Sequence, residues 1–500
     1  MRISLVLGVI GQLLRYFCLA FLAPLGLALF DGEYDVAGHF AVASVVSLIA
    51  GIVLAKSFRR GMNFGRAEAL GVVAGSWMVL GHISAIPYVF AGLSPVDALF
   101  ESISGFTTTG ATILQDFSLY GRAFYLWRSM TQWFGGLGVI ALFVVILPQL
   151  GIAGRQLFFA EASGAPGEAA SPQVRQGASR LWMLYIGLTL TQTALLMGLA
   201  KWPFYDSICH AFTTMAAGGF SPNPESIQGY HNPTAEWIFI VFMILGGTSF
   251  PLLWTSLTRK PKELIRDGEF QFYFGCTLVV GVLIGGVLVN GIPDLEAVRT
   301  GLFQSASMIS STGYASADFA ATGPDQPWND AARGLLIFVM LVGGCAGSAA
   351  GGAKAVRILL MLKFLWREIT RVLHPRAVLP LRHKGRPIPD PILRAVFNLV
   401  SLYLVGYFVL AMALIFMGID LVTGFTASLA CLGNIGPAFG AAGPMGNFAD
   451  FPVAAKLLLT FAMWIGRLEV VTVLALLHPH VWRNMRWKAD RPPGPWANTS

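Results

Sequence analysis

Ten apolar runs dominate the chain, and each is about as long as a helix that crosses a lipid bilayer. Such a helix needs about 20 mostly apolar residues. Only 12% of the 500 residues are charged, against about 25% in ordinary soluble domains. The sequence therefore predicts an all-α polytopic membrane protein with ten crossings, the eighth of them broken. The runs lie at residues 4–30, 36–56, 68–92, 122–149, 180–200, 234–257, 270–290, 331–346 with 355–366, 393–417 and 453–477.

Basic residues gather in every second connection between these runs. Because Lys and Arg are enriched on the cytoplasmic side of a membrane protein, this alternation predicts that both termini and all the basic connections are cytoplasmic. The first run exceeds the apolar region of about 7–15 residues in a signal peptide, so we interpret it as a retained crossing. The basic connections are 57–66, 155–180, 259–266, 363–394 and 483–491.

Four connections on the opposite side are too long for tight turns. Each contains a half-apolar stretch that is too short to cross, followed by small residues and a glycine. In a membrane, four such segments can surround one axis and offer backbone carbonyl oxygens to a dehydrated cation. We interpret the stretches as re-entrant pore helices and the segments as four parts of one filter. The segments are Thr108-Thr109-Gly110-Ala111, Ala217-Gly218-Gly219-Phe220, Ser311-Thr312-Gly313-Tyr314 and Asn434-Ile435-Gly436-Pro437.

Alignment on the filter glycines indicates an internal fourfold repeat. Thirteen positions before each glycine stands a residue suited to cap a helix N-terminus, and six positions before it stands a small one. The predicted caps are Asp97, Asp206, Thr300 and Thr423, and the small residues are Ser104, Thr213, Ser307 and Ala430. The predicted units are an N-terminal two-helix hairpin (1–66), repeat 1 (67–154, filter 108–111), repeat 2 (155–262, filter 217–220), repeat 3 (263–385, filter 311–314), repeat 4 (386–485, filter 434–437) and a cytoplasmic tail (486–500).

This arrangement suits a monovalent cation. Pore helices whose C-termini converge place about half a negative charge each near the axis, and glycine permits backbone conformations that turn carbonyls toward it. The filter segments contain no carboxylate ring of the kind that binds divalent ions. Close helix packing through small residues is the structural alternative. No Ser/His/Asp set, HExxH motif or paired intramembrane carboxylates point to an enzyme.

At these residues the sequence resembles the Trk/Ktr/HKT superfamily of potassium transporters, most closely its TrkH/TrkG-type bacterial membrane subunits. The resemblance implies four M1-P-M2 repeats around one central pore, a homodimer in the bacterial inner membrane, and a TrkA-type cytosolic regulatory subunit that binds NAD or ATP. It implies K⁺ as the transported ion, held only at the filter residues, and no organic cofactor. The stretches that carry it are 106–112, 132–139, 210–221, 311–314, 343–354 and 434–437.

Two further expectations about partners and ion preference accompany the resemblance. In plant members of the superfamily, serine at the first filter glycine accompanies sodium preference, whereas all four positions are glycine here. The basic connections are expected to contact anionic lipid or the regulatory subunit, and no nucleic-acid partner is expected.

A glycine-rich stretch interrupts the eighth crossing. Glycine costs about 1 kcal/mol relative to alanine inside a helix, so this stretch is predicted to be non-helical. The resemblance implies an intramembrane gating loop at 343–353 beneath the third filter, and a helix-packing patch is the alternative. The residues concerned are Gly343, Gly344, Gly347, Ser348, Gly351, Gly352 and Lys354.

Arg467 lies inside the last apolar run. A charge at mid-membrane costs about 2.5–3.5 kcal/mol on insertion scales and usually faces a cavity or a partner. By resemblance, Arg467 is expected to form a positive barrier below the filter, and a salt bridge with Glu469 is the alternative. Of the other polar residues in the runs, Arg128 is expected to anchor and His210 to be structural. For Glu101, an outer-mouth role and a packing role stay open.

A secondary K⁺ symporter tightly coupled to H⁺ or Na⁺ is the main functional alternative. Inverted repeats and paired broken helices would favour it. The predicted repeats are parallel and only one crossing is predicted to be broken, which favours a gated, channel-like path.

Overall fold

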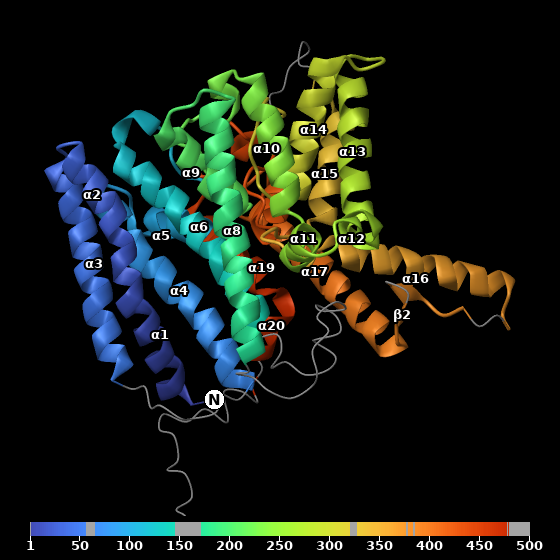
Figure 1. Ribbon diagram of the computed structural model, residues 1–500, viewed down its shortest axis with the longest axis horizontal. Coiled ribbons are helices and arrows are strands. Elements are labelled where there is room, and N and C mark those ends of the chain that lie inside the picture. The colour runs from blue at the N-terminus through green and yellow to red at the C-terminus, as the bar shows by residue number, and fades with distance from the viewer. Residues whose placement is uncertain are drawn as a thin grey trace, which may run out of the picture.

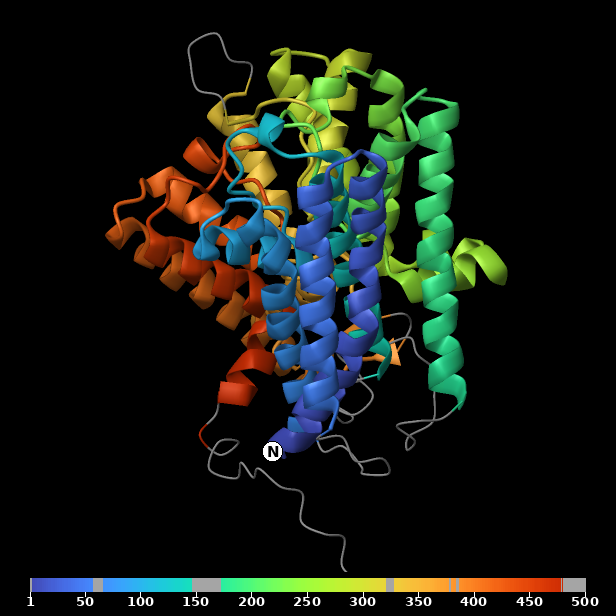
Figure 2. The same ribbon diagram turned by 90° about the vertical axis from the view of Figure 1, so that its left-hand side faces the viewer.

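The N-terminal hairpin is held together by glycines. Its first limb comprises α1 (Ile3–Phe17), η1 (Cys18–Phe21) and α2 (Leu22–Phe30), and its second limb is α3 (Tyr34–Ala55). A Cβ on Gly51 would lie 2.7 Å from the backbone nitrogen of Arg15, so the two limbs touch backbone to backbone. Small residues permit such close approach between membrane helices. Figure 2 shows this hairpin in blue on the face of the helical bundle that is turned toward the viewer, with the N-terminus at its lower end.

Four units with the same order of elements follow the hairpin: a long helix, a short pore helix, an extended segment and a second helix (Figure 1). The computed structural model describes residues 2–56, 66–145, 172–320, 328–376, 379–383, 386–477 and 479. The helices are α4 (Arg66–Phe90), α5 (Pro95–Phe106) and α6 (Arg122–Val145) in repeat 1; α8 (Pro172–Gly198), α9 (Phe204–Met215), α10 (Pro233–Gly246) and α11 (Phe250–Thr258) in repeat 2; α13 (Gly268–Leu288), α14 (Leu295–Ile309), α15 (Asp330–Val342) and α16 (Ala355–Leu373) in repeat 3; and α17 (Asp390–Phe416), α18 (Leu421–Leu432), α19 (Val453–Leu468) and α20 (Val470–Leu477) in repeat 4.

Smaller elements fill the connections. The short helix α12 (Lys262–Arg266) precedes α13, and the two-residue strands β1 (Arg382–His383) and β2 (Arg386–Pro387) pair antiparallel before α17. Three single turns of 3₁₀ helix, η2 (Phe117–Leu119), η4 (Gln228–Tyr230) and η5 (Gly440–Ala442), lie between the filters and the second helices of repeats 1, 2 and 4. The amphipathic α16 leaves the bundle sideways (Figure 1).

Each of the ten predicted runs is mostly helical where the structure describes it. Six of these helices have the length and hydropathy of a membrane span, and a bent pair, α10 with α11, makes a seventh. Of the other second helices, α15 and α19 are shorter than a membrane span. The all-α, polytopic fold class is confirmed.

The predicted pore-helix caps are wrong in position. Asp97, Asp206 and Thr423 lie at the third position of α5, α9 and α18, and Thr300 lies inside α14. The observed caps come earlier. At the start of α5 the hydroxyl of Ser94 accepts the N–H of Asp97 and donates to the Asp97 carboxylate. Asp294 and Asp420 accept the first-turn N–H groups of α14 and α18, while α9 follows Pro203, which provides no side-chain cap.

The prediction of a single broken crossing is also wrong. The second helix breaks in three repeats: α10 and α11 meet at 104°, α15 and α16 are separated by residues 343–354, and α19 and α20 are separated by Glu469, whose φ is 66°. Parts of the connections at 57–66, 155–180 and 483–491, the boundary at 154–155 and the tail at 486–500 lie outside the described residues.

Close contact between α13 and α14 generates a first testable prediction. A Cβ on Gly281 would lie 2.8 Å from the Cα of Leu302, whereas one on Gly275, also on α13, would meet nothing within 4 Å. We expect Gly281→Val to lower the thermal midpoint of the detergent-purified protein, because overpacking costs about 1–3 kcal/mol. Gly275→Val is the control, and equal midpoints for the two variants would contradict the prediction.

Candidate functional site

The four pore helices end in the same hydrogen-bonded turn. In repeat 1 the N–H of Thr108 donates to the carbonyl of Gly105 at 2.9 Å, and the N–H of Thr109 donates to that of Ser104 at 2.8 Å. The same pair of bonds recurs at 217 and 218, 311 and 312, and 434 and 435. This pattern is a Schellman motif, which satisfies the last carbonyls of a helix. The four predicted filter segments therefore leave their helices with one shared geometry.

Left-handed backbone recurs at two positions in each segment. The φ angles are 51° at Thr108, 54° at Ala217, 54° at Ser311 and 52° at Asn434. The filter glycines Gly110, Gly219, Gly313 and Gly436 have φ of 83°, 74°, 82° and 103°. Non-glycine residues in this region cost of order 1–3 kcal/mol and persist only where the surrounding structure dictates them, often at functional sites. Each of the four segments contains one such non-glycine residue, so the surrounding structure must hold its backbone in the left-handed conformation.

The glycines close a ring. Each filter glycine lies so near the next segment that an added Cβ would overlap a backbone carbonyl oxygen there. Gly110 faces the oxygen of Gly218, Gly219 faces that of Thr312, Gly313 faces that of Ile435, and Gly436 faces that of Thr109. The contacts thus run from repeat 1 through repeats 2, 3 and 4 and back to repeat 1. Segments up to 326 positions apart in the sequence surround one axis, as the sequence predicted.

A cavity opens beside this ring. All four filter glycines line it, together with the residues that follow them, among them Phe220 and Pro437. Arg128 also contributes to the lining. Within the described residues no group of three or more His, Cys, Asp or Glu side chains is placed to hold a metal ion. A cation in this ring would therefore meet backbone oxygens and hydroxyl groups.

Hydroxyl groups hold the backbone just beyond two of the glycines. Ser104 donates to the carbonyl of Ala111 at 2.6 Å, and Ser307 donates to that of Tyr314 at 2.7 Å. These are two of the four small residues that the repeat alignment selected. In repeat 2 the equivalent Thr213 bonds the hydroxyl of Tyr314 instead, and Ala430 has no polar group. In repeats 1 and 3 the serine thus bonds the pore helix to the residue that follows the filter glycine.

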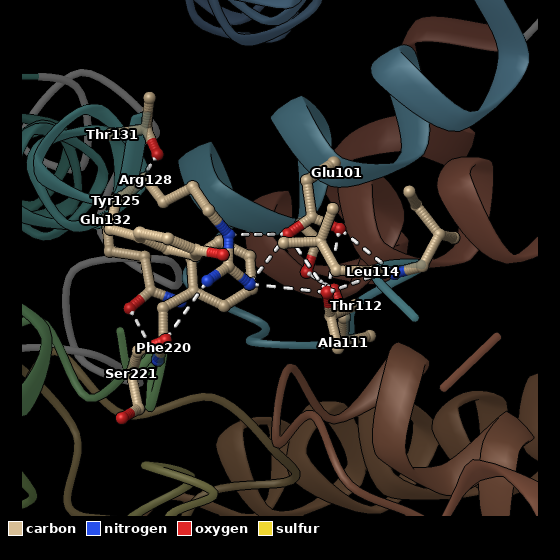
Figure 3. Close-up of polar contacts among 12 residues, drawn as sticks. Glu101, Ala111, Thr112, Leu114, Tyr125, Arg128, Thr131, Gln132, Phe220 and Ser221 are labelled. Atoms are coloured by element: carbon tan, nitrogen blue, oxygen red, sulfur yellow. Dashed lines mark hydrogen bonds and ion pairs between the residues drawn. The ribbon is translucent and has the colours of Figure 1, made fainter. Parts of the chain in front are cut away.

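Glu101 and Arg128 form a buried ion pair between the first and second filters (Figure 3). Their side chains are 0% and 2% exposed, and the Arg128 Nε lies 2.7 Å from the Glu101 Oε1. Removal of one partner from a buried pair typically costs 3–5 kcal/mol, so this pair is a structural anchor, as expected for Arg128. Glu101 is bonded only inside the protein and does not line the cavity, so its geometry fits the packing role of the two left open.

Gln132 and the predicted filter residue Asn434 contact the filter segments through amide side chains, and these contacts were not predicted. Gln132 donates to the carbonyl of Gly218 at 2.7 Å and accepts the N–H of Phe220 at 3.1 Å. Asn434 donates to the hydroxyl of Thr109 at 2.9 Å and to the carbonyl of Met463 at 2.9 Å. Gln132 was detectable in principle, because it lies one helical turn after Arg128 and therefore on the same face.

The glycine-rich stretch is non-helical, as predicted, and lies against three repeats. The N–H of Gly351 donates to the hydroxyl of Ser311 in the third filter segment at 2.6 Å. The N–H of Cys345 donates to the carbonyl of Gly247, at the break between α10 and α11, at 2.8 Å. A Cβ on Gly351 would also overlap the carbonyl oxygen of Gly433, next to the fourth segment.

Two basic side chains hold carbonyls of this loop. Arg467 is 6% exposed and donates to the carbonyl of Ala349 at 2.7 Å, while Lys354 donates to that of Ala350. The Nε and Nη2 atoms of Arg467 are buried without a hydrogen-bond partner in the described part of the chain. The alternative salt bridge between Arg467 and Glu469 is absent there, because Glu469 instead pairs with Arg357 at 2.8 Å.

His210 is fully buried. Its Nδ1 lies 2.7 Å from the carbonyl oxygen of Asp206 and its Nε2 lies 3.1 Å from the hydroxyl of Ser221. The rings of Trp202 and Tyr230 contact it edge-on. Both ring nitrogens are thus engaged within the protein, as expected of a structural histidine.

Comparison with known proteins gives one consistent result. The TrkH family, described as cation transport protein, matches residues 39–278 and 272–482. The Trk system potassium uptake protein TrkH of Halomonas elongata is 33% identical over 97% of this chain and 100% of its own length, and that of Salmonella typhimurium is 37% identical over 83% and 86%. The crystal structure of the potassium transporter TrkH from Vibrio parahaemolyticus covers 97% of this chain and 100% of its own, at 32% identity and a TM-score of 0.86.

The ring contacts generate a second prediction. Gly313 and Gly32 have similar φ angles of 82° and 77°, but only Gly313 faces a neighbouring carbonyl, whereas nothing lies within 4 Å of Gly32. Alanine causes similar backbone strain at both positions. If Gly313→Ala loses more thermal stability than Gly32→Ala, the difference therefore measures the contact of Gly313 with the carbonyl of Ile435. We expect an excess destabilisation of about 1–3 kcal/mol. Equal thermal midpoints for Gly313→Ala and Gly32→Ala would contradict the closed ring.

Proposed function

The chain belongs to the TrkH family of cation transport proteins, and from that premise we propose that it takes up K⁺ through the ring of four filter segments. The family is one of transporters and not of enzymes. The single observation that carries the proposal is the cyclic contact of each filter glycine with the next segment. Such a ring offers several backbone oxygens to one dehydrated ion.

The pore helices and filter glycines supply the preference for K⁺ in this proposal. Four helix C-termini converge on the ring, and each contributes a partial negative charge. All four filter positions are glycine, which the superfamily resemblance associates with potassium over sodium. The names of the relatives, Trk system potassium uptake proteins, support the same ion.

Flux is gated, we propose, by the loop at 343–353 and controlled by a TrkA-type cytosolic subunit that binds NAD or ATP. The loop contacts the third filter segment through Ser311 and the break of repeat 2 through Gly247, so its displacement would change the path below the ring. The protein is proposed to act as a homodimer in the bacterial inner membrane, with both termini cytoplasmic and with lipid contacts along its apolar faces.

A K⁺ symporter coupled to H⁺ or Na⁺ is the second candidate function. One observation favours a symporter more than the sequence did. The second helices of three repeats are broken, where the sequence predicted one broken crossing, and broken helices are typical of coupled transporters. The repeats nevertheless run in the same order and surround one axis, which favours a channel-like path.

The third prediction tests the path directly. Purified protein in liposomes is expected to pass K⁺ and Rb⁺ in proportion to an imposed potential and to pass Na⁺ poorly. Gly110→Ser is expected to lose that preference, because a side chain at Gly110 meets the carbonyl of Gly218. Gly32→Ser is the matched control, since it has left-handed backbone in open space. Radioisotope uptake with each ion gives the measurement.

The outcomes separate the two candidate functions. Flux that follows the potential and loses its preference in Gly110→Ser supports the channel-like path. Uptake that requires a Na⁺ or H⁺ gradient supports the symporter. A Gly110→Ser variant that is identical to wild type contradicts a role for the ring in ion selection.

The fourth prediction concerns Arg467, the proposed positive barrier. Arg467→Ala removes a buried cation and its bond to the carbonyl of Ala349 in the loop. We expect basal K⁺ flux to rise about tenfold or more, the change for one lost charge-assisted hydrogen bond. Shortening the loop within 347–351 is expected to raise basal flux similarly, while Arg467→Lys keeps the charge and most of the barrier. Wild-type flux in Arg467→Ala would contradict the barrier.

A further inference from the structure

The Glu101–Arg128 pair lies where the first two filter segments leave the ring, and its two ends hold different segments. Glu101 is on the pore helix α5, and Arg128 is on α6, the second helix of the same repeat. Arg128 also lines the cavity that the four filter glycines share. Arg128 therefore borders the proposed ion path, while Glu101 is not part of the cavity lining and is fully buried.

Glu101 holds the outer part of the first segment. Its Oε2 accepts the N–H of Ile113 at 3.0 Å, and its carboxylate oxygens each lie 3.1 Å from the hydroxyl of Thr112. These residues follow Gly110 by two and three positions. The carboxylate thus fixes the backbone through which the first segment leaves the ring.

Arg128 holds the outer part of the second segment. Its Nη1 donates to the carbonyl of Ser221 at 3.1 Å, and its guanidinium carbon lies 4.0 Å from the centre of the Phe220 ring. One turn further along α6, Gln132 bonds the carbonyl of Gly218 and the N–H of Phe220. Side chains of repeat 1 therefore hold the second segment on both sides of Gly219 (Figure 3).

At two other junctions the direct links between the filter segments are neutral. Asn434 of the fourth segment donates to the hydroxyl of Thr109 in the first at 2.9 Å. Between repeats 2 and 3, the hydroxyl of Ser226 accepts the N–H of Ala315 at 3.2 Å. The buried ion pair constrains the relative positions of the two segments more tightly than such links do. The reason is that the planar guanidinium group fixes two hydrogen-bond directions at once.

We propose that the Glu101–Arg128 pair is a positioning element for ion selection, which sets the separation of the first and second filter segments. This inference rests on the function proposed above. It assigns a part in ion selection to two residues that lie outside the four filter segments. Discrimination between K⁺ and Na⁺ by carbonyl oxygens depends on the size of the site and on the number and field of the oxygens. A looser junction between the two segments lets the ring close around the smaller ion as well.

The fifth prediction uses a variant that keeps the charge of the pair. Arg128→Lys retains a cation beside Glu101, but a single ammonium cannot also reach the carbonyl of Ser221 from the direction of the guanidinium fork. The ratio of K⁺ to Na⁺ uptake into liposomes is expected to fall by about tenfold, the change for one lost charge-assisted hydrogen bond. The ratio does not depend on how much protein is folded, so a merely structural loss leaves it unchanged.

Two more variants separate position from charge. Glu101→Gln leaves the Arg128 cation uncompensated beside the cavity, so both the ratio and the total cation flux are expected to fall. The double variant Glu101→Gln with Arg128→Gln removes both charges. Its total flux is expected to recover relative to Glu101→Gln, while its ratio stays low because the hydrogen bonds to both segments are gone.

The control is Arg122→Gln on the same helix. The side chain of Arg122 is 51% exposed and pairs with Asp31 of the N-terminal hairpin, so the wild-type ratio is expected. A wild-type ratio in Arg128→Lys, even if Glu101→Gln yields no folded protein, overturns the inference alone. Wild-type protein without any K⁺ preference overturns the proposed function, and the inference with it.

Discussion

Non-helical backbone at the depth of a membrane must have its polar groups satisfied by the protein or by a wet cavity, and the rest of this structure depends on that constraint. The protein meets it four times in the same way, with a Schellman turn at the end of each pore helix. The turn forces left-handed backbone on Thr108, Ala217, Ser311 and Asn434. Each strained segment is then confined by its neighbour, because the filter glycines contact the next segment all around the ring. The contacts around the ring therefore hold each segment in its left-handed conformation.

Contacts between consecutive repeats keep the pore helices in place, and they are equivalent in position but not in chemistry. Glu236 at the start of α10 pairs with Arg299 on α14 at 2.8 Å, whereas Lys456 at the start of α19 pairs with Asp97 on α5 at 2.6 Å. The polarity is reversed between the two pairs. Between repeats 1 and 2 the hydroxyl of Tyr205 donates to the carbonyl of Arg122 at 2.7 Å. At these three junctions the second helix of one repeat thus bonds the pore helix of the next. Two of the junctions use an ion pair and the third uses a hydrogen bond.

The sequence alone predicted the four repeats and the meeting of their glycine segments around one axis, because glycine is the residue that left-handed backbone and close backbone contact both require. It could not place the helix ends, since the same residue types serve at a cap and two or three positions after it, as Ser94 and Asp97 do. The break near Gly247 did have a sequence signal, because Gly246, Gly247 and Pro251 lie together inside that apolar run. The break at Glu469 is marked only by a charged residue, which does not by itself indicate a helix end. The partner of Arg467 is a backbone carbonyl 118 positions away, which no local pattern indicates; Glu469, its neighbour in sequence, pairs elsewhere.

The three breaks in the second helices are connected to one another below the ring. The loop between α15 and α16 bonds the break of repeat 2 through Cys345 and Gly247, and Arg467 just before the break of repeat 4 bonds the same loop through Ala349. Arg357, in the first turn of α16, pairs with Glu469 at that last break. Since α16 leaves the bundle sideways (Figure 1), a displacement of α16 away from repeat 4 would separate Arg357 from Glu469. The loop is thus bonded to repeats 2 and 4 at the same time, so we expect the three breaks to move together.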